Sequence, residues 1–183
     1  MKFIVYNVRD DEIPFVQKWG KDHGVEVAYT TTTLNQETVE EANGFDGISC
    51  LQTIPYSQEL FESMKSMGIK YLSLRNVGVD NIDLAAAKEN DVQITNVPAY
   101  SPQSIAEFAV MMALYLSRKV GYMQKQLDQN HQFHFSPYFM GRLMSEQTVG
   151  IIGTGRIGQE AIKLFKGLGS NVIAYDKYPQ KTT

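Results

Sequence analysis

The sequence predicts an α/β protein, in which a doubly wound parallel sheet is followed by the first β-α-β unit of a second sheet. Short apolar runs alternate with segments of helical period, which is the pattern of parallel strands joined by crossover helices. Gly24, Gly44 and Gly68 follow three of the helical segments, where glycine commonly ends a helix. A long apolar helical segment then separates this pattern from a new strand that begins at Thr148.

Composition narrows the class of protein. The 183 residues can hold one ordinary domain, or a small domain with part of another, and 43% hydrophobic with 20% charged residues is typical of globular proteins. A net charge of −3 gives no reason to expect nucleic acid or an anionic membrane as partner. Cys50 is the single cysteine, so an intrachain disulfide is excluded, and no apolar run approaches the roughly 20 residues of a membrane span. We therefore expect a soluble cytoplasmic protein.

Five apolar runs in residues 1–100 predict the strands of the first sheet. They are "KFIVYNV" from Lys2, "VEVAYT" from Val25, "GISCL" from Gly47, "YLSLR" ending at Arg75 and "VQITNV" from Val92. Helices are expected between them, at residues 12–22, in "NQETVEEANG", in "SQELFESMKSMG" and in "IDLAAAKEN". Because crossovers between parallel strands are right-handed, the sheet is expected to be doubly wound and flavodoxin-like.

A long helix is predicted over residues 101–121. Ser101 can cap it with Pro102 at the first helical position, or Ser104 and Glu107 can form a capping box one step further in. An apolar stripe with spacings of three and four follows, made of Ile105, Ala109, Met112, Leu116 and Val120. Residues 122–147 are polar and irregular and are interpreted as a connector.

A glycine-rich turn opens the second sheet. Gly153, Gly155 and Gly158 fit the pattern G-x-G-x-x-G between the strand "TVGIIG" and the helix "RIGQEAIKLFKGLG". The first glycine permits a tight turn, the second lets the backbone approach a pyrophosphate, and the third lets the helix pack close to the strand. Arg156 and Ile157 lie at the tip, where free N–H groups and the helix dipole favour phosphate.

An acidic residue completes this pattern. Asp176 ends the next strand, "NVIAY", where a carboxylate accepts hydrogen bonds from the adenosine ribose and repels a 2′-phosphate. NAD is therefore favoured over NADP, although Lys177 and Lys181 nearby temper that preference. A turn needed only for packing is the alternative, but strand, helix and acid together favour the start of an NAD-binding Rossmann domain over residues 148–183.

A second candidate site lies in residues 1–100. Val77 and Gly78 follow the strand that Arg75 closes, and successive N–H groups in a glycine turn suit an anion such as a carboxylate. The alternative is a plain turn with Asp80 or Asn81 as helix cap. Tyr100, in "NVPAYSP", either hydrogen-bonds a ligand in an interdomain cleft or only supports a turn.

Four stretches in this order and spacing, "SLRNVGVDNID", "ITNVPAYSP", "SIAEFA" and "VGIIGTGRIGQ", resemble the D-isomer-specific 2-hydroxyacid dehydrogenases, particularly bacterial D-lactate dehydrogenases. The resemblance covers the whole chain. It implies that residues 1–100 form the substrate domain, and that the helix at 101–121 crosses between domains and contributes to a homodimer. The residues that it implies as site residues are Val77 and Gly78 for the substrate carboxylate, Tyr100 for the substrate cleft, Arg156 and Ile157 for the pyrophosphate, and Asp176 for the ribose.

The implied reaction is reduction of pyruvate by NADH to D-lactate. Two departures from the family qualify it. Leu51 stands where close relatives often carry an aromatic residue facing the substrate side chain, so a bulkier 2-hydroxy acid is an alternative substrate. In the family, a second half of the chain supplies the substrate-orienting arginine, the histidine–glutamate pair and a segment that returns to complete the first domain. We therefore expect an N-terminal fragment with no catalytic residue of its own.

The remaining reactive side chains give no rival site. His23 is expected at a helix end, His131 and His134 in connector packing rather than on a metal, and Cys50 in a buried strand. Glu107 is better explained by capping than by acid–base chemistry. Two other functions stay open: an inactive truncated paralogue that pairs with or regulates a full-length subunit, and a redox-sensing binding module similar to the family's corepressors.

Overall fold

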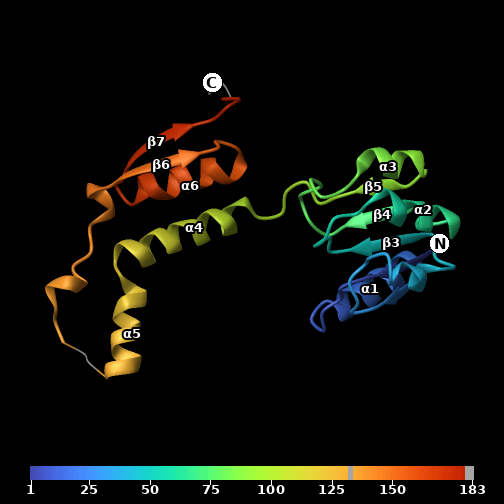
Figure 1. Ribbon diagram of the computed structural model, residues 1–183, viewed down its shortest axis with the longest axis horizontal. Coiled ribbons are helices and arrows are strands. Elements are labelled where there is room, and N and C mark those ends of the chain that lie inside the picture. The colour runs from blue at the N-terminus through green and yellow to red at the C-terminus, as the bar shows by residue number, and fades with distance from the viewer. Residues whose placement is uncertain (132–133, 180–183) are drawn as a thin grey trace. The chain divides into compact units, whose positions relative to one another are not determined.

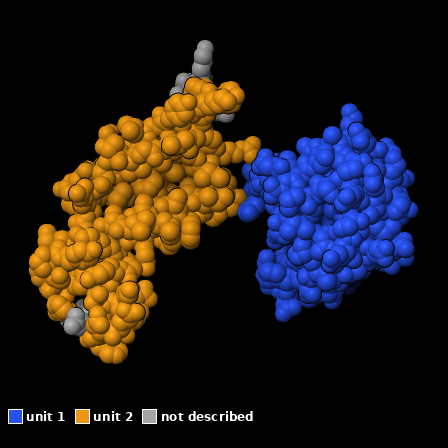
Figure 2. All heavy atoms as spheres, in the orientation of Figure 1, with its two compact units in different colours: residues 1–100 blue, residues 101–183 orange. Residues whose placement is uncertain are grey.

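The computed structural model describes residues 1–131 and 134–179 (Figure 1). The chain divides into two compact units, residues 1–100 and residues 101–183, which Figure 2 shows in different colours. Each unit has its own sheet and its own buried cluster.

The first unit is built on a five-stranded parallel sheet with the strand order β2-β1-β3-β4-β5. Its strands are β1 (Lys2–Val5), β2 (Glu26–Tyr29), β3 (Gly47–Cys50), β4 (Tyr71–Leu74) and β5 (Gln93–Thr95). Right-handed crossovers in this order place α1 on one face of the sheet and α2 and α3 on the other (Figure 1). The predicted doubly wound sheet is therefore confirmed, and its strand order is that of flavodoxin-like folds.

The helices of the first unit begin and end near the predicted residues. They are α1 (Ile13–His23), the 3-10 helix η1 (Val39–Ala42), α2 (Gln58–Ser66) and α3 (Leu84–Glu89). Gly24 ends α1 with a φ of +63°, a left-handed conformation that favours glycine. The cap of α3 is Asp83, whose side chain accepts a hydrogen bond from the Ala86 amide at 2.9 Å. The expectation of Asp80 or Asn81 as cap is wrong, because only Asp83 directly precedes the first turn.

The core of the first unit lies between the sheet and α2. Leu60, Phe61 and Met64, which share one side of α2, are buried with Ile48 of β3 and Leu72 of β4. Burial of each large apolar side chain contributes about 1.5–3 kcal/mol relative to exposure. This face of the sheet therefore accounts for most of the unit's buried apolar surface.

Cys50 lies fully buried at the end of β3, as expected, and accepts a hydrogen bond from the Tyr56 hydroxyl at 3.3 Å. Burial raises the pKa of its thiol to about 11. We expect the native chain at pH 8 to resist a thiol reagent that labels it at once in urea, because only the exposed thiolate reacts. The raised pKa also means that stability falls as pH rises from about 9 to about 11. Equal labelling rates in native and urea-unfolded protein would contradict this prediction.

The second unit contains α4 (Pro102–Ser117), α5 (Val120–Asn130), two 3-10 turns (Pro137–Phe139 and Met144–Glu146), β6 (Thr148–Ile152), α6 (Arg156–Gly167) and β7 (Asn171–Tyr175). Strands β6 and β7 pair in parallel, and α4 packs on α6. The buried cluster between these elements consists of Ala106, Val110, Ala161 and Phe165. None of the helices within the described residues has the length and apolar character needed to cross a membrane.

Three features of residues 101–147 differ from the expectations. The long helix stops at Ser117 rather than residue 121, because Lys119 has a left-handed φ of +55°. Residues 122–130, expected in an irregular connector, belong to α5, whose Tyr122 ring packs on Tyr138 at a centroid distance of 4.7 Å. The helix begins at Pro102 with Ser101 at the N-cap position, as the first alternative predicted, but among the described residues neither Ser101 nor the Ser104–Glu107 pair makes the expected capping hydrogen bond.

Candidate functional site

The carboxyl ends of the parallel strands meet at one edge of the first sheet, where ligands of doubly wound proteins bind. Arg75 follows β4 and donates hydrogen bonds to the backbone oxygens of Tyr6, at 2.9 Å, and Asn7, at 3.0 Å. Its guanidinium also lies 3.6 Å from the Glu12 carboxylate. Arg75 therefore fixes the loop after β1 against the end of β4.

The turn at Val77 and Gly78 lies at this edge and is exposed. Neither of its two backbone amides donates a hydrogen bond to another described residue. A Cβ on Gly78 would meet no atom closer than 3.8 Å, so this turn is not closed by packing. Two neighbouring N–H groups that lack a protein acceptor can bind the two oxygens of a carboxylate.

Leu51 and Tyr100 occupy different environments. Leu51 is half-buried directly after β3, and the following amide, of Gln52, donates to the Asn76 side chain at 3.1 Å. Leu51 therefore belongs to the same edge as Val77. Tyr100 is the last residue of the first unit, and its side chain is 68% exposed with no hydrogen bond to a described residue.

The three glycines of the second unit have three different environments. Gly153 has a φ of +93° and makes the tight turn between β6 and α6, and its amide donates to the Tyr175 oxygen of β7 at 2.8 Å. Gly155 is surrounded by open space. A Cβ on Gly158 would lie 1.9 Å from the Gly153 oxygen, which only glycine permits. These environments match the three roles that the spacing predicts.

The helix α6 begins at Arg156, directly after this turn. The amides of its first turn have no acceptor inside the helix, and the dipole places positive potential there. Arg156 and Ile157 are both exposed. The turn therefore offers an open, positively polarised surface suited to phosphate.

Asp176 follows β7 and is held by three donors. One carboxylate oxygen accepts from the Thr154 amide at 2.5 Å and the Thr154 hydroxyl at 3.0 Å, and the other accepts from the Tyr178 amide at 2.8 Å. The backbone bond from Thr154, then that from Tyr178, lowers the pKa of Asp176 below its usual value. The carboxylate is therefore ionised at neutral pH. Lys177 lies with its Nζ 5.4 Å from the Tyr178 ring centroid, and Lys181 lies outside the described residues.

The remaining candidate side chains lie in other environments. His23 contacts the Trp19 oxygen through Nδ1 at 2.9 Å and stacks on the Trp19 ring at 5.0 Å. His131 ends α5 in a left-handed conformation, and Glu107 is exposed on α4 without capping it. Within the described ranges, no three potential metal ligands lie together.

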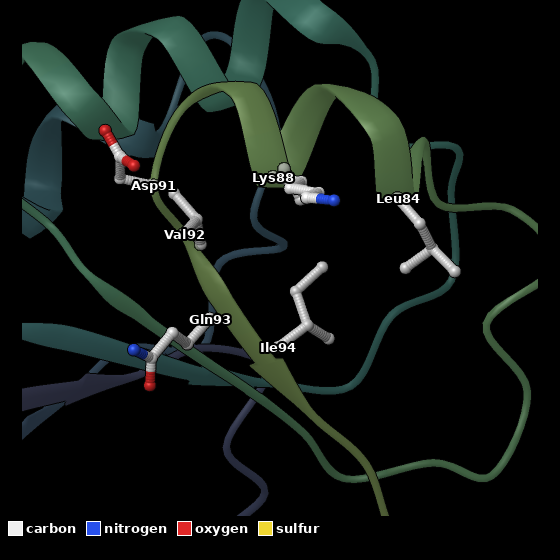
Figure 3. Close-up of a pocket in the computed structure, with 7 residues that line it drawn as sticks. Leu84, Lys88, Asp91, Val92, Gln93 and Ile94 are labelled. Atoms are coloured by element: carbon white, nitrogen blue, oxygen red, sulfur yellow. The ribbon is translucent and has the colours of Figure 1, made fainter.

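Two pockets lie beside the sheet of the first unit. The smaller, of about 390 Å³, lies where Leu84 and Lys88 of α3 extend over Ile94 of β5 (Figure 3), and it contains none of the candidate site residues. The larger, of about 670 Å³, is an apolar groove across the face that carries α1, and its lining includes Phe3, Trp19 and Tyr71. We call it the α1-face groove.

A family model described as the D-isomer specific 2-hydroxyacid dehydrogenase catalytic domain matches residues 3–179. The chain belongs to this family. A D-2-hydroxyacid dehydrogenase (NAD+) of Lacticaseibacillus paracasei is 52% identical over 181 residues, which are 99% of this chain and 54% of that relative. A D-lactate dehydrogenase of Streptococcus pyogenes serotype M1 is 44% identical over 178 residues, 97% of this chain and 54% of that protein.

Solved structures agree with this membership of the 2-hydroxyacid dehydrogenases. A D-2-hydroxyisocaproate dehydrogenase matches 100% of this chain and 55% of its own, with a TM-score of 0.85 and 52% identity. The NAD-complexed enzyme of Lactobacillus delbrueckii ssp. bulgaricus matches 99% of this chain and 55% of its own, with a TM-score of 0.77 and 34% identity. The chain spans about half the length of the curated relatives that it matches.

Several polar residues of this 2-hydroxyacid dehydrogenase chain were missed by sequence reasoning. Thr154 orients Asp176, and Asn76 and Asn96 bind the backbone around Val77 and Gly78. Each directly follows a strand or lies within the glycine turn, and polar residues at the carboxyl ends of parallel strands are the signal that could have identified them.

Proposed function

We propose that this chain forms the substrate-binding part and the first part of the cofactor-binding domain of an NAD-dependent D-2-hydroxyacid dehydrogenase of D-lactate type. The reaction is reduction of pyruvate by NADH and a proton to D-lactate and NAD. The observation that carries this proposal is the pair of amides at Val77 and Gly78, which donate to no described residue and lie at the ligand-binding edge of a chain of this family.

The substrate carboxylate is proposed to accept hydrogen bonds from Val77 and Gly78, with Tyr100 contacting the substrate from the end of the first unit. Exposure of all three residues supports this assignment. The arginine and the histidine–glutamate pair that the family resemblance implies would come from outside this chain, so we assign no catalytic residue to it.

The cofactor NAD is proposed to lie with its pyrophosphate against Gly153, Gly155 and Gly158 and the amides of Arg156 and Ile157. Open space at Gly155 supports this placement, because a side chain there would block the phosphate. When bound as NADH, the cofactor supplies the hydride.

The adenosine ribose is proposed to bind the Asp176 carboxylate. Its lowered pKa and its three protein donors support this, because they hold an ionised carboxylate in one orientation, where it accepts ribose hydroxyls and repels a 2′-phosphate. NADPH is therefore expected to be the poorer cofactor.

Domain roles follow as further proposals. Residues 1–100 form the substrate domain, α4 (Pro102–Ser117) is the dimerisation helix, and residues 148–183 form the start of the NAD-binding domain. A homodimer is supported by α4, whose Ile105, Phe108, Met112 and Leu116 are exposed although they belong to a strongly apolar helix. The cytoplasmic location stays a prediction.

The α1-face groove is proposed to receive the segment that completes the first domain in the family. Parallel sheets bury both faces, and α1 alone leaves this face partly open at Phe3 and Tyr71. An apolar lining of this size suits a helix or an extended segment of apolar side chains.

The direct test of carboxylate binding uses the 183-residue chain itself. Pyruvate is titrated into the ¹⁵N-labelled chain while the backbone amide shifts are followed. We expect saturable shifts centred on Val77 and Gly78, with acetamide, which lacks the charge, as the negative control. A complete titration without a saturable shift at these two amides would refute the carboxylate site.

A bulkier 2-oxo acid is the second candidate substrate. It is favoured by Leu51 at the ligand edge and by the similarity to an enzyme named for 2-hydroxyisocaproate. The test uses a joined enzyme, in which residues 1–183 are followed by the remaining C-terminal part of the Lacticaseibacillus paracasei relative. We expect Leu51→Tyr to shift the ratio of kcat/KM toward pyruvate and away from 4-methyl-2-oxopentanoate by roughly 10-fold or more, because the larger ring fills the side-chain pocket. An unchanged ratio would remove Leu51 from substrate selection.

A further inference from the structure

The loop after β3 carries Leu51 at the ligand-binding edge, and its two ends are joined by a side-chain hydrogen bond. Cys50 is the last residue of β3, and Tyr56 directly follows the loop of residues 51–55. Both side chains are buried, and the Tyr56 hydroxyl donates to the Cys50 sulfur at 3.3 Å. Because this bond links the residue before the loop to the residue after it, it closes the loop at its base.

The backbone at both ends of this loop is also fixed. The Cys50 oxygen accepts from the Arg75 amide at 2.8 Å, which joins the end of β3 to the end of β4. The Tyr56 amide donates to the Asn81 oxygen at 2.9 Å, and the Tyr56 oxygen accepts from the Asp83 amide at 3.1 Å. Tyr56 is therefore anchored by the segment that precedes α3, while its hydroxyl reaches back to β3.

The position of Leu51 follows from these anchors. Successive side chains of a strand point to opposite faces. A Cys50 side chain that Tyr56 holds in the core therefore directs the following residue, Leu51, to the other face. The next residue is held separately, because the Gln52 amide donates to the Asn76 side chain at 3.1 Å. Leu51 thus lies between two fixed points of the chain.

We propose that Cys50 and Tyr56 are positioning residues for Leu51: by closing the base of the loop they set the space for the side chain of the 2-oxo acid, and neither touches the substrate. This inference rests on the proposed function of the ligand-binding edge and on the proposed role of Leu51. Sulfur is a weak acceptor, but a buried hydroxyl that loses its acceptor is costly, so removing either partner should let the loop rearrange. A rearranged loop loses contact with a large substrate side chain, whereas the carboxylate still binds at Val77 and Gly78.

Three substitutions test the hydrogen bond itself. Tyr56→Phe removes the hydroxyl and keeps the ring, Cys50→Ala removes the acceptor, and Cys50→Ser keeps an acceptor at the same position. Tyr6→Phe is the matched control, because Tyr6 is fully buried in the same core and its hydroxyl donates to the Thr38 oxygen at 2.9 Å, which is not part of the loop. Leu51→Tyr is included to show that the measurement responds to the residue being positioned. All variants are made in the 183-residue chain.

The measurement is the ratio of the dissociation constants of pyruvate and 4-methyl-2-oxopentanoate, obtained from amide shifts, together with the melting temperature. We expect Tyr56→Phe and Cys50→Ala to weaken binding of 4-methyl-2-oxopentanoate roughly two- to twelve-fold, which corresponds to the loss of one hydrogen bond, while pyruvate binding stays unchanged. Cys50→Ser and Tyr6→Phe should leave the ratio unchanged. A lower melting temperature alone would not alter this ratio, because both acids bind the same folded chain.

The dynamics of the loop provide a second readout. In Tyr56→Phe without ligand, ¹⁵N relaxation should show the Leu51 amide becoming flexible, with its order parameter falling from about 0.85 toward 0.6, while strand β4 stays rigid. In Tyr6→Phe the Leu51 amide should stay rigid.

The outcomes separate this inference from the proposed function. If Leu51→Tyr alters the ratio but Tyr56→Phe weakens both acids equally, or neither, the inference is overturned and the substrate site stays intact. A ratio that Leu51→Tyr does not alter would overturn the role of Leu51 and the inference with it. An unchanged chain that binds neither acid would overturn the proposed substrate site as well.

Discussion

Replacing Gly158 with alanine is expected to unfold a large fraction of the second unit. The new Cβ would lie 1.9 Å from the Gly153 oxygen, and Gly153 is itself fixed by its bond to Tyr175. Forcing atoms into such a space costs about 1–3 kcal/mol and occasionally more. The cluster that stabilises this unit has only four buried residues among those described, so a cost of this size is a large share of its stability.

The measurement is thermal unfolding followed by circular dichroism, with amide signals of α6 assigning the transition to the second unit. Gly167→Ala is the matched control, because it lies in the same helix, its Cβ would meet no atom within 4 Å, and alanine favours helix by about 1 kcal/mol. Gly155→Ala should also leave stability unchanged, since its surroundings are open. If the Gly158→Ala and Gly167→Ala chains had the same melting temperature, the close approach of α6 to the glycine turn would be contradicted.

The 183-residue chain on its own is expected to show no measurable oxidation of NADH by pyruvate. General acid–base catalysis contributes about 10²- to 10⁴-fold to enzymatic rates, and no described residue near Val77 or Gly78 is assigned as a proton donor to the substrate. His23, the histidine of the first unit, is bound to Trp19 in α1. Groups that orient the substrate, which we propose to lie outside this chain, would be needed for a higher rate.

The assay follows NADH absorbance at millimolar pyruvate, with the Lacticaseibacillus paracasei relative at the same concentration as positive control. A rate above the uncatalysed background that co-purifies with the chain and is lost in Gly155→Val would show that the chain contains catalytic groups of its own. That result would contradict our proposal that the catalytic residues lie outside this chain.

Much of the fold follows from local sequence signals. Apolar runs such as that from Gly47 predicted the strands, and Gly24 predicted the end of α1. The regular alternation of strand and helix predicted the doubly wound sheet. These signals are readable because each depends on a few consecutive residues. The glycine turn at 153–158 was predictable for the same reason, since its three environments are set by backbone geometry within six residues.

Other features depend on contacts that sequence position does not reveal. The helix α5 is polar enough to resemble a connector, and its Tyr122 finds a partner in Tyr138 only after the chain folds back. The residues of α4 that bury against α6 are Ala106 and Val110, which belong to an apolar surface that surrounds much of the helix. Asn96 lies 19 positions after Val77, so its hydrogen bond to the Val77 oxygen emerges only once β4 and β5 pair.

The most direct test of the proposed function is the rate of NADH oxidation by the joined enzyme with pyruvate and with 4-methyl-2-oxopentanoate. We predict turnover that forms the D-hydroxy acid, prefers NADH over NADPH, and is strongly reduced by Gly155→Val. A joined enzyme that folds and binds NADH, yet reduces neither 2-oxo acid, would contradict the assignment of Val77 and Gly78 as the substrate site of a D-2-hydroxyacid dehydrogenase.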